Sequence, residues 1–471
     1  MYDFRKNFRK SFGNPINLVF VVSVLYWIYL ILTSRMVIVY DATAYENLGK
    51  MIVDHGWVEF FKSGPNREPF YPALIAFSMS LGKVFGISYQ FFQTIIQLLF
   101  LFLTQILTLR ILKILKINNL LSALTILYLG ISPAIVNSAL SLFSEIATYP
   151  LILASMLLIY KSWLSFLGTK FRIILLAIVT SLLLVLIVLN KGIFEFVIPV
   201  FFVFFLSSAF FTRNRKVIFN VFVYLLVVIG FFYLLLFSYK SVNVIFNGSF
   251  TVSNRGAWSL YGSTARRMET LTKERFLTAL AYVPGEGVCQ SIFGEEKCRF
   301  WSFWKADELG SQKVSELSNM PSEAVDNTLV VLTKQKVMKN PGQYFLLFSV
   351  EASKMFFWES TQIGYVMYPK GLTKIFTWIP IKNGLRLIMA FLTLLSVIYL
   401  IVLFWRKRMD FLKLENPLIF LYFSLLFIFS SVGFYSIFII IARYLLPIVP
   451  LYLIIIAYVI QDIYLSVFRN K

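Results

Sequence analysis

Histidine and cysteine are almost absent from this 471-residue chain, which contains one His and two Cys. Zinc or iron sites that need several His or Cys ligands cannot be built from so few residues, although carboxylates could still hold a divalent cation. Charged residues are also scarce, at 14%, whereas 59% of the residues are hydrophobic and 18% are aromatic. This composition excludes an ordinary soluble globular protein.

The charges that are present are mostly basic, with 44 Lys and Arg against 23 Asp and Glu and a formal net charge of +21. In a soluble chain this excess would indicate a nucleic-acid partner. In so hydrophobic a chain the excess of Lys and Arg first indicates how the chain is oriented in the membrane, because these residues gather on the cytoplasmic side. We therefore expect membrane lipids and no nucleic acid as partners. The basic clusters lie at residues 5–10, 110–116, 161–172, 213–216, 406–413 and 469–471.

Long apolar runs predict an all-α, multi-pass membrane protein, since a spanning helix needs roughly 20 apolar residues. The chain offers ten such runs, at residues 16–34, 89–110, 120–138, 145–163, 171–189, 194–212, 217–239, 385–405, 416–434 and 443–464. If both termini are cytoplasmic, every basic cluster falls on the cytoplasmic side of the membrane.

Two further apolar stretches are predicted to lie in the outer membrane interface rather than to cross the membrane. Phe70–Phe85 is short and contains Pro72 and Lys83, and Tyr344–Trp358 is interrupted by two charged residues. Counting Phe70–Phe85 as a span would also move every later basic cluster to the wrong side. Interfacial helices are the better prediction for both stretches.

The chain accordingly divides into three predicted parts. Residues 1–240 form a transmembrane module with the first seven spans and a first outer loop at 35–88. Residues 241–384 form a large outer loop with interfacial helices, and residues 385–471 contain the C-terminal transmembrane helices.

Two cysteines, Cys289 and Cys298, lie in the second outer loop, where the compartment would be oxidising. A bridge between them would close about ten residues and stabilise the loop by about 2.5–3 kcal/mol on the chain-entropy model. Two unrelated free thiols are the alternative.

Five polar side chains far apart in the sequence are predicted to share one depth, at the outer ends of the spans. They are Asp41, Glu68, Glu145, Lys191 and Arg443. An acid held against an apolar wall is a candidate base, and cations at this depth could bind an anionic lipid headgroup. Two plainer interpretations stay open. Asp41 could cap a helix over Thr43–Lys50, and Lys191 and Arg443 could simply extend toward the interface.

Four short motifs stand at this predicted outer face. They are Asp41 followed by Tyr45; Arg67-Glu68-Pro69-Phe70-Tyr71-Pro72, which leads into the interfacial helix ending Val84-Phe85-Gly86; Ser144-Glu145; and Ala442-Arg443-Tyr444-Leu445-Leu446-Pro447. In this order they resemble the GT-C-type polyprenyl-phosphate-sugar-dependent glycosyltransferases, which include protein O-mannosyltransferases and lipid A aminoarabinose transferases. The resemblance covers most of residues 1–240 and the last span, and residues 241–384 match nothing in it.

The resemblance implies a GT-C-like fold and transfer of a sugar from a polyprenyl-phosphate donor to a hydroxyl of a lipid, glycan or protein, with inversion at the anomeric carbon. It implies Asp41 as the general base. Lys191 and Arg443 would bind the donor phosphate, with Arg67 a weaker candidate. A lipid phosphate neutralised by cations is a good leaving group, so no separate acid is needed to protonate it.

The other site residues have less specific roles under this resemblance. Glu68 and Glu145 would orient the acceptor or hold a divalent cation, and the requirement for a metal is left open. Tyr45 and Tyr71 would line the sugar site, although interfacial aromatic belts place tyrosines at this depth too. His55, the single imidazole, is expected to be an interfacial residue.

The chain departs from the family pattern at one point. Many relatives have two adjacent acids where this chain has Asp41-Ala42. Any role for a second acid would therefore pass to Glu46, Glu68 or Glu145, or be absent.

Two other functions stay open. A flippase or transporter of lipid-linked sugars usually shows paired halves and polar groups near the midplane, whereas here seven spans precede the long loop and three follow it. A lipid-linked glycan polymerase or ligase would use arginines of the second loop, of which four stand out. These are Arg255, Arg266, Arg267 and Arg275. We expect a protein of a bacterial cytoplasmic (inner) membrane whose active site faces outside.

Overall fold

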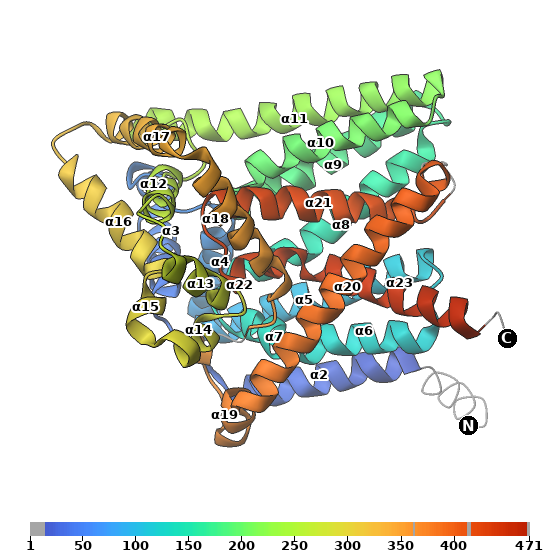
Figure 1. Cartoon of the computed structure of the whole chain (residues 1–471), viewed down its shortest axis with the longest axis horizontal. Coiled ribbons are helices and arrows are strands. Elements are labelled where there is room, and N and C mark those ends of the chain that lie inside the picture. The colour runs from blue at the N-terminus through green and yellow to red at the C-terminus, as the bar shows by residue number, and fades with distance from the viewer. Residues whose placement is uncertain (1–14, 361–362, 412–415, 469–471) are drawn as a thin grey trace.

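The chain folds into a bundle of long helices with a smaller set of helices at one end (Figure 1). The structure is a computed structural model, and it describes residues 15–360, 363–411 and 416–468. Within this described part, nine helical segments are long and apolar enough to cross a membrane. They are α2 (Pro15–Thr33), α5 (Tyr89–Ile114), α8 (Glu145–Ser165), α9 (Lys170–Asn190), α10 (Phe194–Phe211), α11 (Arg215–Asn247), α20 (Ile379–Phe411), α21 (Ile419–Ile437), and the last span, made of α22 (Ala442–Leu445), η3 (Leu446–Ile448) and α23 (Val449–Phe468). The predicted all-α polytopic architecture is confirmed.

The third predicted span, 120–138, is broken. Its two pieces, α6 (Asn119–Ile131) and α7 (Pro133–Leu140), meet at an angle of 45°. Proline lacks an N–H group and clashes with the preceding turn, so the helix stops and restarts at Pro133. The Ser132 side chain accepts a hydrogen bond from the Ile135 N–H and caps the new helix. The described residues contain ten candidate spans if this bent pair counts as one.

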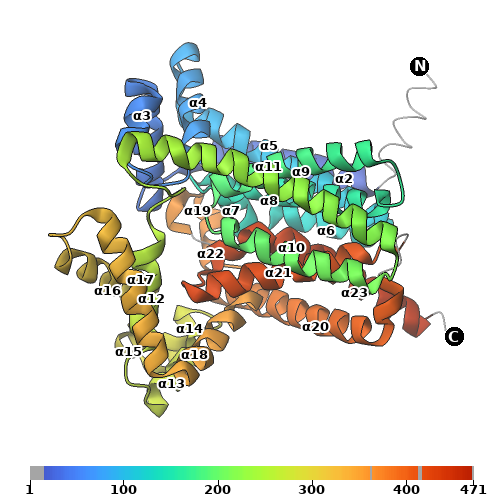
Figure 2. The same cartoon turned by 90° about the horizontal axis from the view of Figure 1, so that it is seen from above.

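The helices at the end of the bundle come from two segments of the chain. The first segment contributes α3 (Asp41–Lys62) and α4 (Phe70–Phe85). The second contributes α12 (Gly256–Arg267), α13 (Lys273–Tyr282), α14 (Glu286–Phe293), α15 (Glu295–Arg299), α16 (Phe303–Glu316), α17 (Ser322–Lys339), α18 (Pro341–Ser353), η1 (Lys354–Phe356), η2 (Ile363–Tyr365) and α19 (Lys370–Thr377). We call this the loop end of the bundle. The start of α2 and the end of α23 lie at the opposite end (Figures 1 and 2).

A short antiparallel pairing joins the two segments of the loop end. Strand β1 (Arg35–Met36), directly after the first span, pairs with β2 (Val366–Met367) near the end of the second segment. Because β1 leads into α3, this pairing places the start of α3 beside the helices of the second segment.

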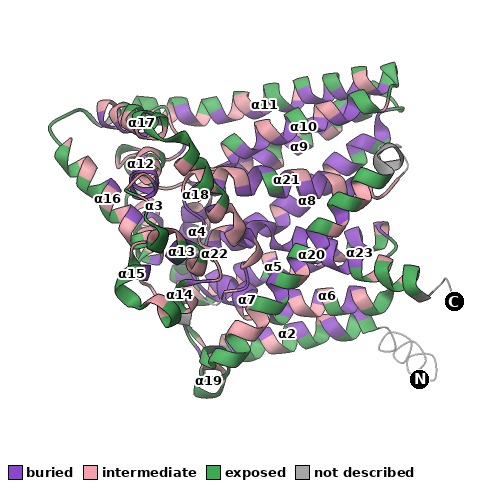
Figure 3. Ribbon diagram, in the orientation of Figure 1, coloured by how far each residue is buried: buried purple, intermediate pink, exposed green. Residues whose placement is uncertain are grey.

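Burial differs among the spans. In α8 and in the last span, 78% of the most apolar stretch is buried, against 28% in α2. Figure 3 shows the buried residues concentrated along the middle of the bundle. The two most central spans therefore begin with Glu145 and with the turn that carries Arg443.

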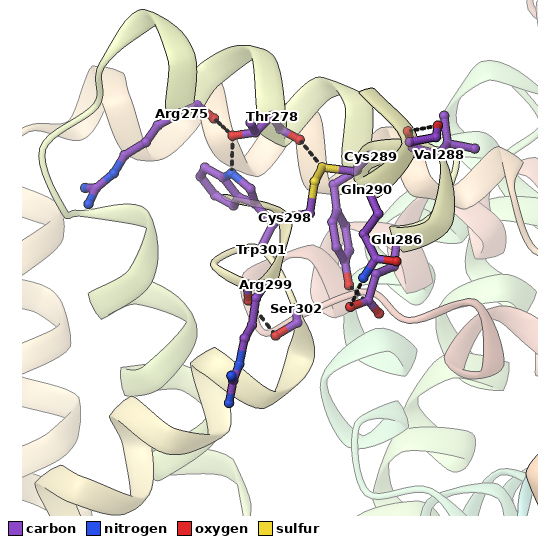
Figure 4. Close-up of a disulfide and its surroundings, with 12 residues drawn as sticks. Arg275, Thr278, Glu286, Val288, Cys289, Gln290, Cys298, Arg299, Trp301 and Ser302 are labelled. Carbon is purple, nitrogen blue, oxygen red and sulfur yellow. Dashed lines mark hydrogen bonds between the residues drawn. A yellow bond between two sulfur atoms is a disulfide. The ribbon is translucent and has the colours of Figure 1, made fainter. Parts of the chain in front are cut away.

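The expected disulfide between Cys289 and Cys298 is present and lies at the loop end (Figure 4). Both cysteines are fully buried. The Cys289 sulfur contacts the carbonyl oxygen of Thr278, whose hydroxyl accepts a 2.9 Å hydrogen bond from the Trp301 indole N–H. The bridge thus helps to fix Trp301, which lines the cavity described next.

Candidate active site at the loop end of the bundle

A cavity of about 630 Å³ opens where the spans meet the helices of the loop end. Seven of the predicted site residues line it: Asp41, Tyr45, Arg67, Glu68, Glu145, Lys191 and Arg443. The remaining one, Tyr71, is buried behind Tyr45, with the two rings edge to face at 5.0 Å, and its hydroxyl donates to Gln97. The structure therefore brings together side chains from the segment after the first span and from the start of the last span.

Asp41 lies between two guanidinium groups. One carboxylate oxygen pairs with Arg67 and the other with Arg443, and Arg255 Nη1 lies 3.8 Å from the first oxygen. Burial alone would raise the pKa of Asp41, but the charges of Arg443 and Arg67 outweigh it and hold the pKa well below its ordinary value. Asp41 is itself the first residue of α3, after Tyr40. The Asp41 side chain therefore pairs with guanidinium groups and does not cap α3.

Glu145 and Lys191 form a second ion pair, with 2.8 Å between Glu145 Oε1 and Lys191 Nζ. Both side chains are largely buried, with 2% and 13% of their surface exposed. The residues that precede them hold the two ends together. Asn190 donates 2.7 Å hydrogen bonds to the Ser144 carbonyl and to the Thr148 hydroxyl, so α9 ends beside the start of α8.

Arg443 links the two carboxylates. Its Nη2 bonds to Asp41, and its Nε lies 3.4 Å from Glu145 Oε1. The Nε–H is buried and has no hydrogen-bond partner among the described residues. The guanidinium also lies over the Phe143 ring, 4.5 Å from its centroid. We call the following five side chains the charge cluster: Asp41, Arg67, Glu145, Lys191 and Arg443.

Glu68 and Tyr45 brace the charge cluster. Glu68 Oε1 accepts a 2.8 Å hydrogen bond from the Gly192 N–H and thereby holds the turn that follows Lys191. The Tyr45 hydroxyl lies 3.1 Å from the Ser144 hydroxyl, and the Arg67 guanidinium lies 4.9 Å from the Tyr45 ring centroid. Glu68 therefore holds the backbone beside Lys191, and Tyr45 contacts both Ser144 and the Arg67 guanidinium.

The segment that leads into Arg443 is held by buried charges from the loop end. Arg267, on α12, donates hydrogen bonds of 3.0 and 2.9 Å to the carbonyls of residues 437 and 438, at the end of α21. Glu351, on α18, accepts a 2.8 Å hydrogen bond from the Ile440 N–H. The second segment of the loop end thus fixes the backbone just before Arg443.

Sequence analysis missed the cavity residues that come from α16 and from the segments around it. They are Tyr40, Phe143, Trp258, Trp304, Asp307 and Tyr365, among others. None belongs to a motif, and most lie in residues 241–384, which resemble nothing. The available signal was the aromatic content of residues 300–304, Phe-Trp-Ser-Phe-Trp.

A close crossing of α12 and α16 positions Trp258, Trp304 and Asp307. A Cβ atom on Gly262 would lie 2.0 Å from the Ala306 carbonyl oxygen, and one on Gly310 would lie 2.5 Å from the Trp258 carbonyl oxygen. Only glycine allows the two backbones to approach this closely. The crossing therefore fixes α16 against α12 on both sides of Asp307.

The described residues offer no group of three or more His, Cys, Asp or Glu that could hold a metal ion. Glu145 is paired with Lys191, and Glu68 accepts from a backbone N–H. Glu46, a candidate for the second acid, and His55, the single imidazole, do not line the cavity. Glu46 accepts a 2.6 Å hydrogen bond from the Tyr89 hydroxyl, and His55 lies on α3 away from the cavity.

Comparison with solved structures finds a remote likeness. No protein-family model matches the chain. No curated protein sequence matches it either. The archaeal oligosaccharyltransferase AglB from Archaeoglobus fulgidus, solved in complex with an inhibitory peptide and a dolichol-phosphate, is similar with a TM-score of 0.42 and 13% identity. The alignment covers 96% of this chain and 51% of AglB, so the chain spans about half the length of that protein.

Proposed function

We propose that this protein is an inverting glycosyltransferase that moves a sugar from a polyprenyl-phosphate donor to a hydroxyl acceptor on the outer face of the membrane. The observation that carries the proposal is the charge cluster. Arg443, at the start of a central span, contacts both Asp41 and Glu145, and Arg67 and Lys191 complete the set in a cavity of about 630 Å³.

The cations of the charge cluster suit a lipid phosphate. Arginine presents several N–H donors that match phosphate oxygens, and lysine adds a compact positive charge. Lys191 and Arg443 lie at the ends of apolar spans, where a prenyl chain can stay in the bilayer while its phosphate enters the cavity. Positive charge placed on the phosphate stabilises it as the leaving group.

Asp41 is proposed as the general base, and its environment suggests that donor binding comes first. With Arg67 and Arg443 as partners its pKa is low, so it accepts a proton poorly. A phosphate that takes over the N–H groups of these arginines would raise the pKa of Asp41. The acceptor oxygen then bonds to the anomeric carbon, its proton moves to Asp41, and the bond from that carbon to the phosphate oxygen breaks.

The position of the charge cluster favours an enzyme over a transporter. Asp41, Glu145, Lys191 and Arg443 lie at helix ends, and Arg67 lies in the loop between α3 and α4, all at the loop end of the bundle. A transport path would need polar groups near the bilayer midplane. A polymerase or ligase built on second-loop arginines is less favoured. Of the four candidates only Arg255 lines the cavity, while Arg266 and Arg267 are buried and Arg275 pairs with Glu269.

Deleting the gene in its host and comparing envelope lipids and glycans by mass spectrometry tests the proposal. We expect one sugar substituent to disappear, to return with the wild-type gene, and not to return with Asp41→Asn. An unchanged envelope, or full restoration by Asp41→Asn, would contradict the proposed function.

A further inference from the structure

Helix α16 presents two side chains of different character to the cavity. Trp304 and Asp307 are three residues apart and therefore lie on the same face of the helix. Both line the cavity that contains the charge cluster. Trp304 is 58% exposed, which is high for so large an apolar side chain in a structured segment. A ligand that covered this ring would remove its apolar surface from water.

Asp307 is a carboxylate without a bonded partner. Within the described residues it forms no hydrogen bond and no ion pair. Burial raises its pKa above the ordinary value, the nearby Arg255 opposes this, and Asp41 adds to it. The side chain is half-buried, so its oxygens have given up part of their water without gaining a protein donor. Such a group is ready to accept hydrogen bonds from a ligand.

Tyr40 supplies a second exposed ring beside Trp304. The two ring centroids are 5.6 Å apart with an angle of 51° between the planes, and Tyr40 is 67% exposed. Its φ of 50° is uncommon for a residue other than glycine and marks a constrained backbone. Tyr40 directly precedes Asp41, so the aromatic pair lies next to the proposed base.

These features favour a carbohydrate over a peptide or a lipid. Sugar rings combine apolar C–H faces, which pack on aromatic rings, with hydroxyl groups, which donate to carboxylates. A peptide bound by strand addition would need free backbone groups on a strand edge, and the lining here is made of helices, turns and side chains. A lipid chain would need an apolar groove, whereas Asp307 and Arg255 face this part of the cavity.

We propose that α16 forms a saccharide-binding subsite in which Trp304 and Tyr40 pack against sugar rings and Asp307 accepts hydrogen bonds from sugar hydroxyl groups. That the bound saccharide is the acceptor of a transfer reaction rests on the proposed function. Saccharide binding itself does not depend on it.

Direct binding to the purified full-length protein tests this subsite without requiring catalysis. The probes are fluorescently labelled maltotriose, cellotriose and chitotriose, and the readout is fluorescence polarisation. We expect at least one probe to bind, and Trp304→Ala and Asp307→Asn each to weaken its affinity at least fivefold. Two matched controls are expected to bind as the wild type does. Trp378→Ala removes an equally exposed Trp, at 58%, outside the cavity, and Glu308→Gln changes the adjacent exposed acid of α16.

The possible outcomes separate this inference from the proposed function. Equal binding by all four variants, or no binding of any trisaccharide, would overturn the subsite. If trisaccharides bind through α16 but no donor sugar is transferred to any acceptor, the subsite stands and the glycosyltransferase proposal fails.

Discussion

Each carboxylate of the charge cluster has at least two cationic neighbours. Asp41 pairs with Arg67 and Arg443, and Glu145 lies within ion-pair distance of Lys191 and Arg443. Removing one member of a buried pair leaves the other charge uncompensated, which costs about 3–5 kcal/mol. The loss of activity in a charge-cluster variant therefore has to be compared with the loss of activity in a variant that breaks a buried ion pair elsewhere in the molecule.

Alanine at Lys191 or Arg443 should weaken use of the lipid donor more than use of the acceptor. Each charge-assisted hydrogen bond to phosphate contributes about 1.5–3 kcal/mol, so the donor KM should rise about 10- to 100-fold. Steady-state kinetics with each substrate varied in turn measures this.

The matched control for this prediction is Lys240→Ala. Lys240 also forms a buried ion pair with a glutamate, Glu195, but it does not line the cavity. It should lose stability without a selective rise in the donor KM. If Lys191→Ala and Arg443→Ala raised the two KM values equally, the phosphate role would be wrong.

At the scale of helices, the site depends on how the helices of the loop end pack against the bundle. The α12–α16 crossing sets the position of Asp307, and Arg267 and Glu351 hold the segment before Arg443. A motif search cannot find such elements, because glycines and buried charges act here through contacts with distant parts of the chain. Substitutions at these residues should change the stability of the folded protein, which can be measured.

Alanine at Gly262 should destabilise the protein by forcing α12 and α16 apart. The added methyl group would meet the Ala306 carbonyl, and such overpacking costs about 1–3 kcal/mol. The thermal unfolding midpoint in detergent reports the loss. Gly287→Ala is the control, because its Cβ would meet nothing within 4 Å. Equal midpoints for the two variants would contradict the close crossing.

Glu351→Gln should lower stability in a pH-dependent way. Burial would raise the pKa of Glu351, but Lys354, Arg266 and Arg267 lower it from 4.5 to about 2. The folded-state pKa is thus depressed, so ionised Glu351 stabilises the fold above about pH 4.5 and this contribution is lost as the pH falls through about 2.

Thermal unfolding between pH 3 and pH 7 checks this dependence. The difference in thermal unfolding midpoint between wild type and Glu351→Gln should be largest near pH 7 and should become smaller toward pH 3. Glu269→Gln, which changes a partly exposed pair with Arg275 on the same segment, should show a small gap throughout. A Glu351→Gln gap that did not change with pH would contradict the assigned ion network.

At the scale of the whole molecule, the apolar runs were enough to predict the spans, since a bilayer demands long hydrophobic helices. The break in the third span was missed even though Pro133 signals it, because apolar composition alone treats 120–138 as continuous. Helix α11 also runs to Asn247, past the predicted boundary at residue 240. Such ends depend on packing against the loop end.

Part of the site followed from topology. Placing Asp41, Glu145, Lys191 and Arg443 at the same ends of their spans was sufficient to expect them together, and the structure brings them together. The contribution of α16 could not be predicted, because the path of residues 241–384 is set by tertiary contacts such as the Gly262–Ala306 approach. The pairing of Asp41 with two arginines also required the structure.

The measurement that tests the central claim most directly is sugar transfer by the purified protein, reconstituted with a panel of polyprenyl-phosphate hexoses and hydroxyl acceptors. Wild type should form product that mass spectrometry detects. Asp41→Asn should reduce the rate at least about 100-fold, as expected for loss of a general base. Asp54→Asn, which changes an exposed ion-paired acid on the same helix, should stay within about twofold of wild type, as surface ion pairs contribute little. An Asp41→Asn variant that transfers sugar at the wild-type rate would contradict the account.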